Sequence, residues 1–163
     1  MKIMTMSDLY IDQLQDIHSC ERQLIKAMPK MAKAASHPQL REAFNKHLVE
    51  TKGQLERLNT ILESFGKAAG RKVCKAAVGL IEEGSEIVDA DADEEVRDAG
   101  LICAAQKIEY YEIATYGCLR TYAQLLGRTA DVRLLEKTLA EEKKADDSLT
   151  ALATGLINAE ALS

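Results

Sequence analysis

Apolar residues recur along most of the chain with the spacing of an amphipathic α-helix, in which the buried stripe repeats at positions i, i+3, i+4 and i+7. Four long segments carry this pattern, over residues 7–35, 38–65, 93–126 and 129–156. Glycines and a run of acidic residues set the middle of the chain apart, and a shorter helix is predicted there over residues 73–88. The pattern therefore predicts an all-α protein.

Residues that favour helix ends lie where the periodicity starts and stops. Ser7 or Asp8 can accept hydrogen bonds from the free amides of a first helical turn. Pro38 suits an early helical position because its missing amide proton is not needed there. Gly66 is placed to end the second helix in the left-handed conformation.

Two short links and one long link define the expected topology. The links at residues 36–37 and 127–128 are so short that they join antiparallel neighbours, whereas a middle segment of about 27 residues can cross the bundle. We therefore expect a four-helix bundle with a long crossover connection that carries a short helix. A length of 163 residues suits a single domain over residues 1–163.

The net charge of the chain limits the classes of binding partner that we expect. With a net charge of -5 and a pI of about 5.3, the sequence shows no basic stripe of the kind that neutralises phosphates, so direct nucleic-acid binding is not expected. The first residues do not resemble a signal peptide, and no apolar run is long enough to span a bilayer. We therefore expect a cytoplasmic protein without a membrane partner.

The cysteines form no recognisable sequence motif. None is paired in a C-x-x-C spacing, so neither a zinc knuckle nor a dithiol redox motif is indicated. In a reducing compartment they are expected to be free thiols that fill helical faces, with a reactive or interfacial thiol as the alternative. They are Cys20, Cys74, Cys103 and Cys118.

Acidic residues interrupt the apolar stripes near the middle of the long helices. Three of the stripes contain an acid and the second has one at its border, beside a histidine. The residues concerned are Glu21, His47, Glu50, Glu109, Glu112, Glu142 and Asp146. Glu109 and Glu112 are one helical turn apart, so one helix can present both carboxylates to the same place.

Counting from the turns puts these acids at one height in the bundle. Glu21 precedes the first hairpin turn by about 15 residues and Glu50 follows it by about 14, which matches their heights at 1.5 Å per residue. Glu112 and Glu142 match across the second turn in the same way. The carboxylates are therefore expected to converge at mid-bundle.

Converging carboxylates need neutralisation, because burying an isolated carboxylate costs several kcal/mol or more. Metal ions, protonation with a raised pKa, and salt bridges are the chemical options, but no Lys or Arg shares the central stripe. Among metals, iron or manganese suits a cluster of hard oxygen ligands. A pair of such ions is the bundle-core site of ferritin-like carboxylate proteins.

Four segments resemble the YciF-type bacterial stress proteins of the ferritin-like superfamily. The segments are "SCERQL" (19–24), "HLVETKGQLERL" (47–58), "AQKIEYYEIATYG" (105–117) and "TLAEEKKADDSL" (138–149). The resemblance spans nearly the whole chain and implies a ferritin-like bundle, a cytoplasmic stress-associated protein and a homodimer. It does not imply a defined biochemical activity.

Within that superfamily the acids are most similar to those of rubrerythrin. The resemblance implies a dinuclear iron or manganese site with five matching ligands: Glu21, Glu50, Glu109, Glu112 and Glu142. Two histidine positions do not match, since they hold Gly53 and Asp146, and His47 lies one turn before the glutamate of the second helix. Asp146 and His47 are retained as candidate ligands.

The resemblance also suggests roles for the ligands. Glu50 and Glu142 would bridge or ligate from opposite hairpins, Glu21 and Glu112 would be terminal ligands, and Glu109 would switch with metal valence. The implied chemistry is reaction with peroxide or oxygen, of the peroxidase, catalase or ferroxidase type. The alternative is a metal-free dimeric module with a structural or binding role in the stress response.

Overall fold

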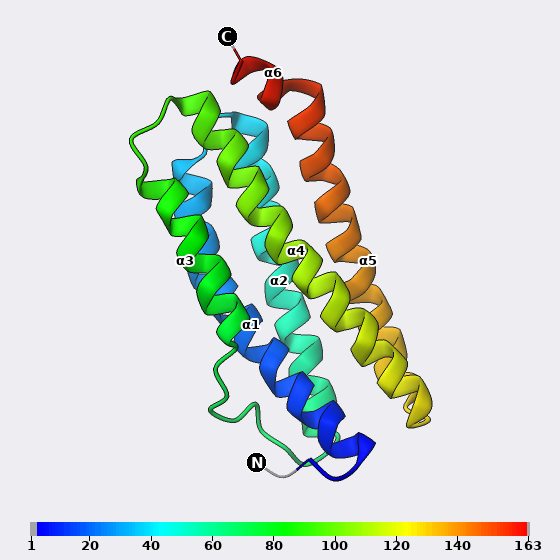
Figure 1. Ribbon diagram of the computed structural model, residues 1–163. Coiled ribbons are helices and arrows are strands. Elements are labelled where there is room, and N and C mark those ends of the chain that lie inside the picture. Colours follow the sequence, from blue (N-terminus) through cyan, green and yellow to red (C-terminus); the bar gives the residue numbers. More distant parts are fainter. Residues whose placement is uncertain (1–2, 163) are drawn as a thin grey trace.

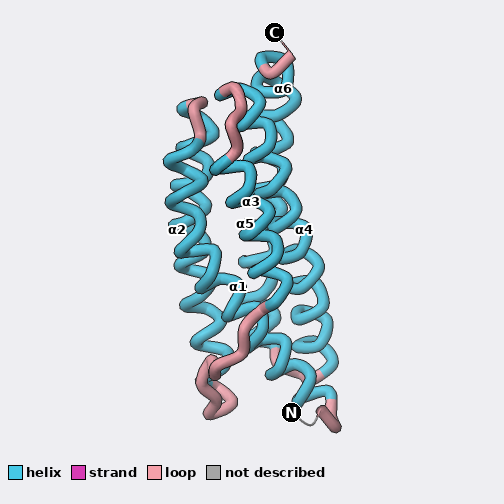
Figure 2. Tube along the Cα trace, turned by 60° about the vertical axis from the view of Figure 1, so that its left-hand side comes forward, coloured by secondary structure: helices cyan, strands magenta, loops and turns pink. Residues whose placement is uncertain are grey.

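Four long helices form a bundle in the computed structural model, which describes residues 3–162 (Figure 1). They are α1 (Met6–Ala34), α2 (Pro38–Glu63), α4 (Glu94–Leu125) and α5 (Thr129–Leu152). A shorter helix, α3 (Lys75–Asp89), lies in the connection between α2 and α4. Only helices and loops occur in the described part of the chain (Figure 2). The all-α prediction and the crossover bundle are therefore confirmed.

The connection through α3 returns the chain to the opposite end of the bundle. As Figure 1 shows, α2 and α4 consequently run in the same direction, while α1 pairs with α2 and α4 pairs with α5 as antiparallel hairpins. The hairpins meet through contacts of α1 with α4 and of α2 with α5, and α3 packs against α1 and α4. Every long helix thereby presents one face to a shared interior.

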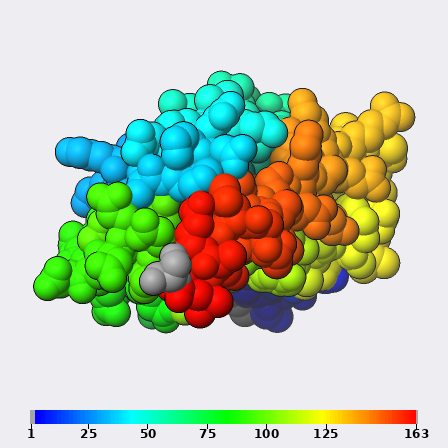
Figure 3. Space-filling model, turned by 90° about the horizontal axis from the view of Figure 1, so that it is seen from above, coloured from blue at the N-terminus to red at the C-terminus, as the bar shows by residue number. Residues whose placement is uncertain are grey.

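The helix type changes after α5, which is shorter than the sequence predicts. The sequence predicts that the last helix continues to residue 156, but α5 ends at Leu152 and a π-helical segment, Ala153–Ile157, leads into the short α6 (Asn158–Glu160). These last elements contact α4 and cover part of the end of the bundle that holds the α1–α2 turn (Figure 3). None of the described helices has the length and apolar character needed to cross a membrane.

Side chains at the helix ends explain where the elements begin. The cap of α1 is Thr5, and not Ser7 or Asp8: its hydroxyl accepts the Asp8 amide at 3.0 Å, and the Asp8 carboxylate accepts the Thr5 amide at 2.9 Å. This reciprocal pair satisfies two amides that no helical carbonyl reaches. Gly66 has φ +62°, the left-handed conformation that the sequence predicts for the end of α2.

Buried apolar residues form two clusters, one toward each end of the bundle. One includes Tyr10, Leu14 and Leu119, and the other includes Leu40 and Leu101. Between them lies a layer of buried polar side chains contributed by α1, α2, α4 and α5. The apolar clusters above and below hold these polar groups away from water.

Gly100 marks a close approach of α3 to α4. A Cβ at this position would lie 2.8 Å from Cγ2 of Ile87, whereas a Cβ at Gly117, on the same helix, would meet nothing within 4 Å. We expect Gly100→Ala to lower the free energy of unfolding by about 1–2 kcal/mol through overpacking. The matched Gly117→Ala should raise it by roughly 0.5–1 kcal/mol through helix propensity. Urea unfolding of both variants tests this contact, and equal stabilities would contradict it.

Candidate metal site

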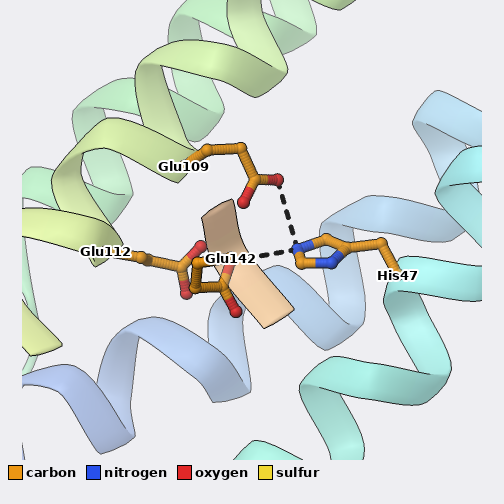
Figure 4. A group of neighbouring side chains, drawn as sticks. All are labelled: His47, Glu109, Glu112 and Glu142. Atoms are coloured by element: carbon orange, nitrogen blue, oxygen red, sulfur yellow. Dashed lines mark ion pairs between the residues drawn. The ribbon is translucent and has the colours of Figure 1, made fainter. Parts of the chain in front are cut away.

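Four polar side chains from three helices converge at mid-bundle (Figure 4). His47 comes from α2, Glu109 and Glu112 from α4, and Glu142 from α5. One nitrogen or oxygen atom of each lies within 4.8 Å of the corresponding atoms of the others. All four are buried, with Glu112 and Glu142 completely inaccessible to solvent. We call these four residues the central cluster.

His47 lies on the inward face of α2, although the apolar pattern predicts a stripe with His47 beside it, made of Phe44, Leu48, Thr51, Leu55, Leu58 and Leu62. The buried residues of this helix include His47, Thr51 and Gln54, whereas Leu48 and Leu55 are only partly buried. Because His47 and Gln54 are polar, the sequence pattern favoured the neighbouring Leu48 and Leu55 as inward positions. The rotation of α2 is instead set so that its imidazole points at the acids of the second hairpin.

The imidazole of His47 joins acids of both hairpins. Its Nε2 lies 3.2 Å from Oε1 of Glu109 and 3.6 Å from Oε2 of Glu142, and its Nδ1 lies 3.5 Å from Oε2 of Glu50. Burial acts to lower the pKa of His47, but the Glu50 carboxylate and the charge of Glu142 outweigh burial and raise it. Without metal, the imidazolium form is thus favoured and partly offsets the acids.

The carboxylates of the central cluster are short of hydrogen-bond donors. Both oxygens of Glu112 and one oxygen each of Glu109, Glu142 and Glu21 are buried without a hydrogen-bond partner among the described residues. Burial, and then repulsion by neighbouring acids, chiefly Glu142, raise the pKa of Glu112 well above its ordinary value. The pKa of Glu109 is raised for the same reasons, with burial again the largest. The buried carboxylates of the central cluster therefore need to be neutralised by protons or by metal ions.

Two uncharged donors position individual carboxylates. The Tyr116 hydroxyl donates to Oε1 of Glu21, and Nε2 of Gln54 donates to Oε1 of Glu142. The guanidinium of Arg57 acts on Glu21 through its charge, but it forms its ion pair with Oε2 of Glu141, at 2.6 Å. The orienting role of Tyr116 and Gln54 was not deduced from sequence, because it depends on contacts across helices.

Glu21 adjoins the central cluster from α1. It is fully buried, and its charge adds to the causes that raise the pKa of Glu112. Burial and the charge of Glu142 raise the pKa of Glu21 well above its ordinary value. Interacting buried carboxyls can share a proton or bind a common cation. Glu21 therefore extends the set of oxygen ligands from three acids to four.

The other two predicted ligands lie at the margin. Glu50 is only 3.5 Å from His47 but sits at the rim, where its side chain is 25% exposed. Asp146 is partly buried and accepts a hydrogen bond from Nε2 of Gln106 at 2.9 Å. The structure thus brings four of the seven predicted residues into one tight group, places Glu21 and Glu50 beside it, and engages Asp146 elsewhere.

Two cavities reach the central cluster from different sides, and His47 and Glu109 line both. The first, of about 390 Å³, opens beside α3 and is lined mainly by apolar side chains such as Leu24 and Ile81. The second, of about 460 Å³, opens between α2 and α5, where Glu50 is part of its wall. Small molecules therefore have access to the buried acids.

Comparison with known proteins identifies relatives over the whole length. The family described as "Domain of unknown function (DUF892)" matches residues 5–162. Protein YciF of Escherichia coli (strain K12) is 45% identical over 162 residues, covering 99% of this chain and 98% of that protein. The crystal structure of YciF, described as an E. coli stress protein, matches with a TM-score of 0.92 at 46% identity over 96% of this chain and 99% of that chain. YcfI of Rhodopseudomonas palustris matches with a TM-score of 0.88 at 40% identity over 91% and 95%.

Proposed function

Because the chain belongs to the DUF892 family, in which YciF is described as a stress protein, we propose that it is a stress-associated ferritin-like protein whose bundle core holds iron or manganese. One observation carries the proposal: buried carboxylate oxygens without hydrogen-bond donors converge with an imidazole at mid-bundle. Carboxylate oxygen and imidazole nitrogen are ligands that both metals accept.

The donor set fits such ions. His47, Glu109, Glu112 and Glu142 would hold metal, with Glu21 as a further oxygen ligand, and together these residues offer enough donors for two ions. Two divalent cations would balance four carboxylates. A metal-free structural bundle would instead bury both oxygens of Glu112 with no donor, an arrangement that stability alone does not favour.

The side chains around the cluster would prepare it for metal. Gln54 and Tyr116 fix one oxygen each of Glu142 and Glu21 and leave the other oxygen free. The proton on Nε2 of His47 must leave before that nitrogen can bind metal, so binding releases protons. When bound, iron or manganese supplies a redox-active Lewis acid for reaction with peroxide or oxygen. The two cavities are large enough to admit such small oxidants.

Metal content tests the proposal directly. We expect anaerobically reconstituted protein to bind two Fe(II) or Mn(II) ions per chain, and the double variant Glu112→Ala, Glu142→Ala to lose them. The double variant Glu95→Ala, Glu136→Ala removes two exposed acids of the same helices and should bind metal as the wild type does. Absence of bound metal, or equal binding by both double variants, would overturn the proposal.

The homodimer that the resemblance implies stays a prediction. Light scattering of the purified protein, with and without metal, measures the oligomeric state. A monomer at all concentrations would contradict the prediction and leave the metal proposal untouched, because every residue of the central cluster comes from one chain.

A further inference from the structure

A third cavity lies where the loop that leads from α2 to α3 packs against α1, away from the central cluster. Its volume is about 260 Å³. Arg22 and Lys26 from α1 and Arg71 and Lys72 from the loop line it, and no Asp or Glu does. The whole chain, in contrast, has a net charge of -5. We call this hollow the basic cavity.

Hydrogen bonds to α1 hold the loop wall of the basic cavity in place. Nε2 of Gln15 donates to the carbonyl of Ala68 at 2.9 Å, at the start of the wall. The amide of Cys74 donates to Oγ of Ser19 at 3.0 Å, at its end. The segment between these two anchors contributes Arg71 and Lys72. The basic cavity is therefore formed before any ligand binds, which lowers the entropic cost of binding.

Lys72 is already engaged with acids of α1. Its Nζ lies 2.6 Å from Oδ2 of Asp12 and 3.6 Å from Oδ1 of Asp16, and it donates to the carbonyl of Asp12 at 3.3 Å. Lys72 thus neutralises these acids and adds a third anchor between the loop and α1. Its charge is not available to a ligand.

The other three cations of the basic cavity have no partner among the described residues. The side chains of Arg22, Lys26 and Arg71 are exposed and take part in no ion pair and no hydrogen bond there. Arg22 and Lys26 are four positions apart on α1, where like charges destabilise a helix. Stability of the fold therefore does not account for the three charges, whereas a bound anion would.

The kinds of side chain indicate phosphate groups. The guanidinium of an arginine can donate two parallel hydrogen bonds to phosphate oxygens, and a lysine adds a compact positive charge. One phosphate group carries about 1.5 to 2 negative charges near neutral pH, fewer than the three unpaired cations supply. Two linked phosphate groups match that charge more closely.

We propose that the basic cavity binds the diphosphate group of a small metabolite, held by Arg22, Lys26 and Arg71. The two arginines come from opposite walls, one from α1 and one from the loop, so that each can bind one phosphate. A long polyanion such as nucleic acid is disfavoured, because it would also meet the net negative charge of the remaining surface. The site is separate from the central cluster and needs no metal ion.

Calorimetric titration of the full chain with inorganic pyrophosphate tests the proposal. Metal is first removed, because pyrophosphate itself binds such ions. At physiological ionic strength, which screens long-range attraction, we expect one pyrophosphate to bind per chain. Orthophosphate and citrate should bind at least about tenfold more weakly, because one has a single phosphate group and the other has only carboxylates.

Two nucleotides distinguish the possible sources of the diphosphate group. ADP contains it and AMP does not, so ADP should bind at least about tenfold more tightly than AMP. If ADP also binds more tightly than pyrophosphate, the ligand is a nucleotide. If it binds equally or more weakly, the diphosphate group alone is recognised.

Charge-removing variants locate the site. Arg22→Gln, Lys26→Gln should weaken pyrophosphate binding by about tenfold or more, and Arg71→Gln should weaken it several-fold. The matched control is Arg133→Gln, Lys137→Gln, which removes an arginine and a lysine with the same spacing from an exposed face of α5 and should leave binding unchanged. Thermal unfolding checks that each variant is folded.

Three outcomes would overturn the proposal. They are no binding of pyrophosphate by the wild type, binding of citrate as tight as that of pyrophosphate, and equal loss of binding in the two double variants. The variant Glu112→Ala, Glu142→Ala should still bind pyrophosphate, so failure of this proposal is distinguishable from failure of the metal proposal.

Discussion

Chelation of bound metal is expected to lower the melting temperature of the wild-type protein by roughly 5–10 °C. A ligand that binds only the native state at a hundred times its Kd stabilises that state by about 2.7 kcal/mol. For a chain of this size each kcal/mol corresponds to a shift of about 2–4 °C. Calorimetry of protein loaded anaerobically with Fe(II) or Mn(II), before and after EDTA, measures the shift.

The variant Glu112→Gln tests whether the shift in melting temperature comes from metal bound in the central cluster. The variant keeps the side-chain volume but has no carboxyl to ionise where both oxygens lie without partners in the core. It should show no shift on chelation, and its metal-free form should exceed the metal-free wild type in unfolding free energy by about 1–3 kcal/mol at neutral pH, because the cost of keeping this carboxyl in the core, either ionised or protonated above its ordinary pKa, is removed. Glu136→Gln, at an exposed position of α5, should behave as the wild type. A Glu112→Gln protein that keeps the EDTA-dependent shift would refute the assignment of this ligand.

The same charges make the metal-free protein less stable as pH rises. The pKa values of Glu21, Glu109 and Glu112 are raised by burial above the ordinary 4.5, so the native state holds more protons than the unfolded chain from about that pH upward. The unfolding free energy then falls with increasing pH until these groups have ionised in the native state too. His47, whose pKa is also raised, contributes in the same direction. Urea unfolding across weakly acidic to weakly alkaline buffers should show this slope, and Glu112→Gln should flatten it.

Asp98→Ala is expected to lower the free energy of unfolding by about 3–4 kcal/mol. Asp98 comes from the start of α4 and is 2% exposed, and its two carboxylate oxygens accept the amides of Ser36 at 2.9 Å and His37 at 2.7 Å. Hydrogen bonds to a charged group contribute about 1.5–3 kcal/mol each, and the substitution leaves two backbone donors of the α1–α2 turn without partners. The carboxylate also faces the N-terminus of α2, where negative charge is favourable.

The matched variants of Asp98 separate charge from packing. Asp98→Asn keeps one acceptor oxygen and should lose about half as much stability. Glu94→Ala removes an exposed acid one turn earlier on α4 and should change the unfolding free energy by less than about 0.5 kcal/mol. If Asp98→Ala unfolds in urea within about 1 kcal/mol of the wild type, the turn does not depend on this carboxylate.

The sequence predicts the bundle because apolar periodicity and turn length are local signals. Glu21, Glu112 and Glu142 lie in clear apolar stripes, and the structure buries all three. On α2 the periodicity is right only in part: Phe44, Leu58 and Leu62 are buried as predicted, but polar His47 and Gln54 also face inward.

Contacts between distant segments were beyond the reach of sequence reasoning. The hydrogen bond from the Cys74 amide to Oγ of Ser19 depends on how the crossover connection packs on α1, and no spacing rule joins residues in different helices. The same holds for Asp98, whose partners lie in the turn of the other hairpin. Such side chains are found only when the rotation and height of every helix are known.

The central cluster joins the two hairpins, which are otherwise linked covalently only through the connection that carries α3. His47 belongs to the first hairpin, and Glu109 and Glu142 belong to the second. An ion held by all three would make separation of the hairpins require its loss. Amide hydrogens at mid-length of α2 and α5 would then exchange only through global unfolding, whereas without the ion they would exchange through a partial opening that leaves each hairpin intact.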